Sequence, residues 1–235
     1  MSDFSKSFED VRTFLRDYKN TDPEKQVQCY DVWAEKYEKD VPLLGYNAPT
    51  LAVNCLLSNF PESREAALVL DVACGTGLVA KLMSELGFRH FVGVDGSKGM
   101  LEQAAKTGLY QDLRLALLGT QPLPAQADMF DVVMMVGALG VGFVPVSVAR
   151  ELCHATKPGG FVCITRGGHR VESTYRLKAD LEKEFQLMEE EGLWTCVEAK
   201  EKDKYMRNVH SNNKRDVQEE EYISGSVYLY RKSLK

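Results

Sequence analysis

The sequence predicts an α/β domain with a mostly parallel sheet and helices on both faces, and two observations lead to this prediction. Between residues 68 and 165, short apolar runs of strand length alternate with helical patterns, the order that right-handed crossovers give a parallel sheet. The run Val132-Val133-Met134-Met135-Val136 is apolar throughout, as in a strand that is buried on both faces. Helices must therefore cover both sides of the sheet.

Length and composition narrow the class of protein. The chain has 235 residues, 44% hydrophobic and 27% charged, which are ordinary values for one globular domain. The formal net charge of −5 argues against a standing nucleic-acid surface. The sequence has no apolar run of the roughly 20 residues a membrane helix needs and no apolar leader. We therefore expect a cytoplasmic protein, with the nucleus as a second compartment, and no membrane partner.

The six cysteines form no C-x-x-C pair, and most lie in apolar periodic segments. Free cysteine in such positions behaves as a small hydrophobic residue. We therefore expect reduced thiols and neither a disulfide framework nor a metal site.

The N-terminal part is predicted to be helical. Residues 1–20 carry a short helical pattern that we expect to be an appendage, held loosely on a single domain of residues 21–235. A clearer helix begins at Asp22-Pro23, an N-cap followed by proline, and a second runs from Pro49 to Phe60. Tyr30, Trp33 and Tyr37 form an aromatic stripe on the first of these helices, and periodicity alone favours simple core packing for it.

The rest of the chain follows the alternating pattern. Strands are expected at about 68–72, 91–95, 113–118, 131–136 and 161–165, with helices at about 78–86, 97–106 and 146–156. A long charged helix over 172–191 precedes an antiparallel pair, 193–200 and 226–232. Between these two strands, the polar segment from Glu201 to Glu221 is expected to be a solvated hairpin loop, the alternative being a flap that faces the substrate.

The turn after the first strand is the candidate ligand site, and two cofactors compete for it. Gly75-Thr76-Gly77-Leu78-Val79-Ala80 fits the dinucleotide pattern G-x-G-x-x-G/A, with Asp95 about 20 residues on to bind the ribose. However, Asp71 precedes the turn, and its carboxylate would repel a pyrophosphate by about 1–4 kcal/mol. A ligand with an ammonium group, a ribose and no phosphate fits better. S-adenosylmethionine is such a ligand.

Four segments in this order resemble the motif set of the class I S-adenosylmethionine-dependent methyltransferases: Val69 to Gly77, Val92 to Asp95, Phe130 to Val136 and Lys157 to Gly160. The segment Tyr30 to Tyr37 resembles the lid helix of the small-molecule branch of that family. The resemblance spans about residues 25–232 and makes residues 21–60 the lid helices. It implies a Rossmann-like class I methyltransferase fold, with a seven-stranded mostly parallel sheet, an antiparallel C-terminal strand and helices on both faces. It also implies an enzyme with S-adenosylmethionine as donor and S-adenosylhomocysteine as product.

The same resemblance implies roles for individual residues. Asp71 would hold the methionine ammonium, and Asp95 would accept both ribose hydroxyls. The turn would let the backbone approach the amino-acid and ribose parts through Ala73, Cys74, Gly75 and Gly77. The other expected cofactor contacts are the lid residues Trp33, Tyr37 and Tyr46, the adenine neighbours Gly96 and Met100, and Gly137 beneath the sulfonium.

Two positions depart from the family pattern. Ala73 stands where the family usually has its first glycine, which is tolerable if Ala73 keeps φ below zero. After the third strand the family often has an acid that binds the adenine amino group. Here the sequence reads Leu118-Gly119-Thr120-Gln121, so this contact would fall to Thr120 or Gln121.

The acceptor is less well defined by the sequence. The segment Gly137 to Phe143 holds no acid, histidine or Asn-Pro-Pro-Tyr motif, so no catalytic residue is singled out and the nucleic-acid-methylating branch is disfavoured. Arg166, His169 and Arg170 are candidate acceptor contacts, against the alternative of a polar loop. We expect a monomer that methylates a small molecule, or alternatively a protein side chain. A cofactor-binding module without transfer activity and an NAD-dependent oxidoreductase are the competing functions.

Overall fold

The computed structural model describes residues 7–17, 22–140, 144–168, 172–209 and 221–234. Its centre is a seven-stranded sheet in the order β3-β2-β1-β4-β5-β7-β6. The strands are β1 (Leu68–Val72), β2 (His90–Asp95), β3 (Tyr110–Leu115), β4 (Phe130–Val136), β5 (Thr156–Gly168), β6 (Trp194–Arg207) and β7 (Tyr222–Lys232). β7 is antiparallel to both of its neighbours, and the pairs among β1 to β5 are parallel. The predicted architecture is confirmed.

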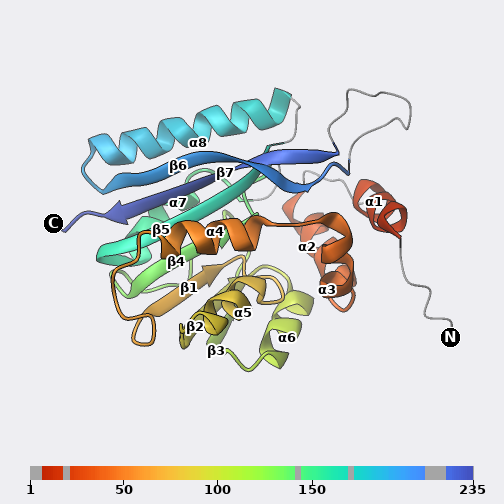
Figure 1. The fold of residues 1–235 in the computed structure, drawn as a ribbon, viewed down its shortest axis with the longest axis horizontal. Helices are drawn as coiled ribbons and strands as arrows, with labels where there is room; N and C mark the ends of the chain where they lie inside the picture. The colour runs from red at the N-terminus through yellow and green to blue at the C-terminus, as the bar shows by residue number, and fades with distance from the viewer. Residues whose placement is uncertain (1–6, 18–21, 141–143, 169–171, 210–220, 235) are drawn as a thin grey trace.

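Helices cover both faces of the sheet (Figure 1). The helices are α1 (Phe8–Asp17), α2 (Pro23–Trp33), α3 (Tyr37–Asp40), the 3₁₀ helix η1 (Val41–Leu44), α4 (Ala48–Leu57), α5 (Leu78–Glu85), α6 (Lys98–Lys106), α7 (Val148–Ala155) and α8 (Glu172–Glu190). Within β1, Leu70 and Val72 pack in the core on the α7–α8 side, whereas Val69 packs in the core on the α4–α5 side. Successive side chains of a strand point to opposite faces, so both cores are filled by apolar residues.

Two strands have bounds that differ from the expected ones. β3 was expected at 113–118 but begins at Tyr110, because Tyr110 already pairs with Phe91 of β2. β5 extends from Thr156 to Gly168 and so includes the expected turn Lys157 to Gly160. Because β5 lies between β4 and β7, hydrogen bonds on both of its edges prolong it beyond its apolar run.

The C-terminal hairpin is longer than the sequence pattern indicates. β6 runs to Arg207, and Tyr205 near its end is only 2% exposed. A solvated loop over the whole of Glu201 to Glu221 is therefore wrong, because Glu201, Lys202, Met206 and Arg207 pair with β7. The rest of the expected loop, residues 210–220, lies outside the described residues.

Helices α1, α2 and α3 gather at one end of the molecule (Figure 1). The helix expected to continue from Pro23 breaks after Trp33, and the chain folds back through α3 and η1. This fold-back lets the Trp33 indole N–H donate to an Asp40 carboxylate oxygen at 2.8 Å. The stripe side chains therefore pack around one indole instead of along one straight helix.

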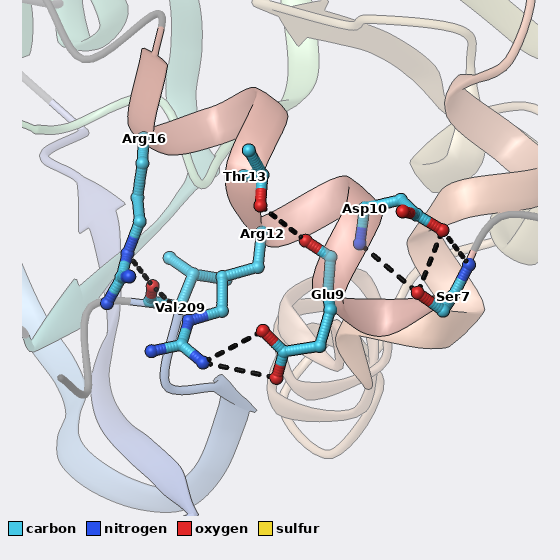
Figure 2. Close-up of polar contacts among 7 residues, drawn as sticks. All are labelled: Ser7, Glu9, Asp10, Arg12, Thr13, Arg16 and Val209. Atoms are coloured by element: carbon cyan, nitrogen blue, oxygen red, sulfur yellow. Dashed lines mark hydrogen bonds and ion pairs between the residues drawn. The ribbon is translucent and has the colours of Figure 1, made fainter. Parts of the chain in front are cut away.

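Helix α1 packs on this group, contrary to the expectation of a loosely held appendage. Val11 is fully buried, and the Nε atoms of Arg12 and Arg16 both donate to the Val209 carbonyl, at 3.1 and 2.9 Å (Figure 2). The guanidinium of Arg207 also lies 3.9 Å from the centre of the Phe8 ring. These contacts join the start of the chain to the end of β6, a long-range packing that local periodicity cannot indicate.

Within the described ranges, no helix is long and apolar enough to cross a bilayer.

Candidate cofactor and acceptor site

The turn between β1 and α5 is built from left-handed backbone. Ala73, Gly75 and Gly77 have φ values of 55°, 56° and 91°. The condition that Ala73 keeps φ below zero is therefore not met, and its methyl group costs about 1 kcal/mol of strain. This conformation lets the Cys74 amide donate to the Val94 carbonyl of β2 at 3.0 Å, so the turn is tied to the neighbouring strand.

Asp95 ends β2 directly beside this turn. Its carboxylate accepts the Gly75 amide and the Ser97 amide, both at 2.8 Å. Burial raises the pKa of Asp95, while these amides oppose that rise. Each carboxylate oxygen keeps a further lone pair, so Asp95 can accept two hydroxyl donors in addition to the two amides.

Asp71 lies below the turn and is 1% exposed. Its carboxylate accepts the Tyr110 hydroxyl at 2.7 Å. Burial raises the pKa of Asp71 to about 7, although the bond from Tyr110 works against this. A Cβ at Gly93 would lie 2.9 Å from the Tyr110 ring and 3.0 Å from the Cys74 sulfur, so Gly93 leaves the space that these two side chains fill.

Two other side chains of the turn have distinct environments. Burial raises the pKa of the Cys74 thiol, and an inert buried thiol of this kind serves packing rather than nucleophilic chemistry. The Thr76 hydroxyl is buried and has no hydrogen-bond partner. Buried polar atoms are normally satisfied in proteins, so the Thr76 hydroxyl is a group in the turn that could donate to a ligand.

The lid aromatics divide into two groups: Trp33 lies in the core of the lid, whereas Tyr30 and Tyr37 feel the charge of Asp95. Trp33 is 4% exposed and packs with Val11, Leu44 and Val209 in the core of the lid itself. Tyr37 lies edge-on to Trp33, with ring centres 4.7 Å apart. Burial raises the pKa values of Tyr30 and Tyr37, and the charge of Asp95 raises both further.

Tyr30 and Tyr37 are therefore the lid aromatics whose hydroxyls lie in the field of Asp95. The sequence prediction singled out Tyr37 but not Tyr30, although Tyr30 belongs to the same stripe.

The lid is anchored at the N-terminus of α6. The Asp31 carboxylate accepts the Ser97 hydroxyl at 2.6 Å and the Gly99 amide at 2.8 Å. A Cβ at Gly99 would lie only 3.0 Å from the Asp31 carbonyl oxygen, so a glycine is needed for this close approach. Asp31 was not predicted from the sequence, because the contact joins two distant helices.

Gly96 and Met100 flank this anchor. A Cβ at Gly96 would lie 3.3 Å from both Val27 and Leu117, and Met100 is 2% exposed. The structure thus brings the two expected adenine neighbours together beside the lid, and adds Val27 and Leu117 to the residues there.

Gly137 follows β4 and lies under two tyrosine hydroxyls. A Cβ at Gly137 would lie 1.9 Å from the Tyr46 hydroxyl oxygen and 3.4 Å from that of Tyr205. The Gly137 amide donates to the carbonyl and hydroxyl oxygens of Thr165, at 3.2 and 3.1 Å. The Tyr205 hydroxyl lies 3.3 Å from the Thr165 hydroxyl. Tyr46, Gly137, Thr165 and Tyr205 therefore form one polar cluster, which we call the hydroxyl cluster.

Burial sets the protonation state of the hydroxyl cluster. It raises the pKa of Tyr205 to about 12 and places the pKa of Tyr46 well above its ordinary value. Both hydroxyls are therefore neutral donors near pH 7. Tyr205 was missed from the sequence, where the only signal is a single aromatic residue within a charged run.

The remaining predicted positions lie elsewhere or outside the described residues. Thr120 and Gln121 line a depression of about 790 Å³ together with Ser147 and His154 on the α7 side. Their contact with an adenine stays a prediction. His169 and Arg170 are not among the described residues. Among the residues that the structure does describe, no group of three or more His, Cys, Asp or Glu side chains is placed to hold a metal ion.

Comparison with known proteins places this arrangement in a family. A family described as a methyltransferase domain matches residues 69–160. The human protein Methyltransferase-like protein 27 is 48% identical over 170 residues, which are 72% of this chain and 68% of that protein. The chain therefore belongs to the class I S-adenosylmethionine-dependent methyltransferases.

More distant relatives are similar over shorter parts. The 18S rRNA (guanine-N(7))-methyltransferase RID2 of Arabidopsis thaliana is 27% identical, over 62% of this chain and 50% of that protein. The ribosomal protein L11 methyltransferase of Pseudomonas putida is 30% identical, over 64% of this chain and 55% of that protein. A putative methyltransferase in complex with the Trm112 activator of Haloferax volcanii shares the fold, with a TM-score of 0.59, 14% identity and coverage of 87% and 97% of the two chains.

Proposed function

We propose that this chain transfers a methyl group from S-adenosylmethionine to a small-molecule acceptor that binds at the hydroxyl cluster. The observation that carries the proposal is the Tyr46 hydroxyl over Gly137, because it places a lid residue on the expected methyl position. A position covered by the chain's own lid suits an acceptor small enough to be enclosed with the cofactor.

The residues of the turn fit a donor that has hydroxyls and an ammonium group. Asp95 would accept the two ribose hydroxyls on its remaining lone pairs. The unpartnered Thr76 hydroxyl supplies a further donor in the turn. Asp71 would balance the ammonium, and an adjacent cation would favour its ionised form near pH 7.

The proposed contribution of the chain to the reaction is mainly positional. S-adenosylmethionine supplies an electrophilic methyl group bound to a sulfonium. Holding an acceptor atom in line with it can account for up to roughly 7–11 kcal/mol of the barrier. The neutral hydroxyls of Tyr46 and Tyr205 would orient the acceptor by hydrogen bonds, since their raised pKa values keep them protonated and leave no phenolate to act as a base near pH 7. The lid would exclude water.

A protein side chain is the second candidate acceptor, and the similarity to a ribosomal protein L11 methyltransferase supports it. The name of the Arabidopsis thaliana relative indicates RNA as the acceptor of that protein. The net charge of −5 weighs against RNA as the acceptor of this chain. A small molecule remains our proposal because the lid already covers the hydroxyl cluster.

Two measurements test the proposal. Calorimetric titration should give binding heat with S-adenosylhomocysteine and none with NAD, and the opposite result would contradict the site. A labelled-methyl screen should then transfer label into the metabolite fraction of a cell extract. Label only in the protein or RNA fraction would replace the small-molecule acceptor, and label in no fraction would favour a binding module. Light scattering of the same sample would check the expected monomer.

A further inference from the structure

Strand β6 bulges shortly before its end. Lys202 of β6 lies opposite Gly225 of β7. The next paired residue of β6 is Met206, which lies opposite Ile223. Three residues of β6 therefore face a single residue of β7. Lys204, the middle one of the three, has a φ of 55°, a left-handed conformation that is uncommon outside glycine. Bulges often re-aim a side chain beside an active site.

The bulge changes the face of the sheet on which Tyr205 lies. Gly225 is two residues from Val227, which packs on the α4–α5 side, and opposite residues of an antiparallel pair share a face. Lys202 therefore points to the α4–α5 side, and regular alternation would send Tyr205 to the other face. Instead the Tyr205 ring lies over Gly225, where a Cβ would be 2.1 Å from it. The bulge thus brings the Tyr205 hydroxyl to 3.3 Å from that of Thr165.

Asn47 holds this bulge from the lid. Its backbone amide donates to the Tyr205 carbonyl and its side-chain amide donates to the Lys204 carbonyl, both at 2.9 Å. Asn47 is also the N-cap residue of α4, where an asparagine side chain usually accepts an amide of the first helical turn. None of the described α4 amides donates to it, so the side chain serves the bulge instead of the helix. Because Asn47 directly follows Tyr46, one short lid segment supplies a hydroxyl to the hydroxyl cluster and also holds the strand that supplies another.

We propose that Asn47 is a positioning residue for the methyl acceptor: by holding the β6 bulge, it keeps the Tyr205 hydroxyl at the hydroxyl cluster, where that hydroxyl binds the acceptor. Because Asn47 belongs to the lid, closing the lid and placing Tyr205 become one step. The inference rests on the proposed function for the contact between Tyr205 and the acceptor. The effect of Asn47 on the position of Tyr205 can be tested without an acceptor.

The first test follows Tyr205 by NMR in the full chain, isotopically labelled at the tyrosine Cζ atoms. The Tyr205 resonance is assigned by its loss in Tyr205→Phe. Asn47→Asp keeps the size of the side chain and a favourable N-cap, but it replaces the amide donor by an acceptor that the Lys204 carbonyl repels. We expect the Tyr205 resonance to shift in Asn47→Asp, while the resonance of Tyr110 on β3 stays unchanged.

Asn54→Asp, at an exposed position of α4, adds the same charge and is the matched control. It should leave both tyrosine resonances unchanged. Should Asn47→Asp fail to fold, Asn47→Ser also caps a helix well and lacks the amide donor. A Tyr205 resonance that is unchanged in the folded Asn47 variant overturns the proposal.

The second test separates positioning from a merely structural role. For the acceptor from the labelled-methyl screen, kcat/KM should fall about tenfold in Tyr205→Phe, as expected for the loss of one hydrogen bond. Asn47→Asp should lose a similar factor, and the double variant should lose no more than either single variant, because Asn47 acts through Tyr205. The affinity for S-adenosylhomocysteine should be unchanged in all three proteins. Additive losses, or an equal loss of affinity for S-adenosylhomocysteine, overturn the proposal. Transfer to no acceptor would contradict the proposed function instead, and the NMR comparison would still decide whether Asn47 holds Tyr205 in place.

Discussion

The carboxyl ends of β1 and β2 differ from those of β4 and β5 in the charge that they carry. The first pair presents the carboxylates of Asp71 and Asp95, which accept the Tyr110 hydroxyl and the Gly75 amide, respectively. The second pair carries the neutral Thr165 hydroxyl on one face of the sheet and, on the other, the buried Arg166 guanidinium, which donates to the Thr174 carbonyl of α8. One edge of the sheet thus has an acidic half, where we propose that the cationic donor binds, and a basic half, beside which we propose that the acceptor binds.

The two halves also differ in how far apart their residues lie in the sequence. Asp71, the turn and Asp95 fall within 25 residues and can be read as one pattern. The hydroxyl cluster combines the lid, β4, β5 and β6, so only the complete fold assembles it.

The largest expected effect concerns Asp71 in the acidic half. Its folded-state pKa of about 7 lies above the ordinary 3.8, so between about pH 4 and pH 7 the folded chain binds more protons than the unfolded chain. The free energy of unfolding should therefore fall as pH rises through that window, by up to roughly 4 kcal/mol. Asp71→Asn should remove most of this fall in urea denaturation between pH 5 and pH 8.

Asp95 contributes a slope of the same sign, because burial raises its pKa too. Some pH dependence should therefore persist in Asp71→Asn. Asp112→Asn on β3, whose side chain is 49% exposed, is the control. A pH profile of Asp71→Asn identical to that of the unmodified chain would contradict the burial argument.

The next effect concerns Gly225 in the basic half. A Cβ there would lie 2.1 Å from the Tyr205 ring and 2.8 Å from the Arg166 carbonyl. Gly225→Ala should cost about 3 kcal/mol of stability by overpacking and displace Tyr205, while the folded fraction keeps its affinity for S-adenosylhomocysteine. At Gly167 the corresponding distance to Tyr205 is 3.3 Å, so Gly167→Ala is the mild partner. Equal losses in the two variants would show that Tyr205 is not held as described.

Asp95→Ala should weaken S-adenosylhomocysteine binding at least about tenfold, since charge-assisted hydrogen bonds are worth about 1.5–3 kcal/mol. Calorimetry measures the affinity, and circular dichroism checks that the fold is retained. Glu102→Ala, on the exposed side of α6, should bind normally. Unchanged affinity in Asp95→Ala would remove the ribose role from the acidic half.

A smaller effect concerns the lid that spans both halves. Asp31→Ala removes the carboxylate that accepts two hydrogen bonds from the start of α6. The free energy of local opening of the lid should fall by about 1 kcal/mol, so amide exchange over residues 25–46 should become faster. Adding S-adenosylhomocysteine should slow exchange over the same residues in the unmodified chain. Glu35→Ala is an exposed control on the same segment. Exchange that responds neither to the substitution nor to the ligand would mean that the lid does not move.

The same division explains what the sequence could predict. Hydrophobic alternation and turn glycines are local, so they predicted the alternation of strands and helices and singled out the turn with Asp71 and Asp95 on either side of it. Tyr205 and Asp31 were missed because each acquires its role from a partner far along the chain: Thr165 is 40 residues from Tyr205, and Ser97 is 66 residues from Asp31. The packing of α1 on Val209 was missed for the same reason.

The smallest effect concerns Ala73, the point where the local reading was wrong. Its φ of 55° places a methyl group in left-handed backbone, at a cost of about 1 kcal/mol or more. Ala73→Gly relieves that strain, but the glycine also stabilises the unfolded chain by about 0.4–1 kcal/mol through its greater conformational entropy. The net gain in the free energy of unfolding should therefore be below about 1 kcal/mol. Ala105→Gly, at an exposed position within α6, should instead lose about 0.5–1 kcal/mol. Urea denaturation of both variants measures the difference. Because the same exchange should stabilise the turn and destabilise the helix, losses in both would mean that the turn does not strain Ala73.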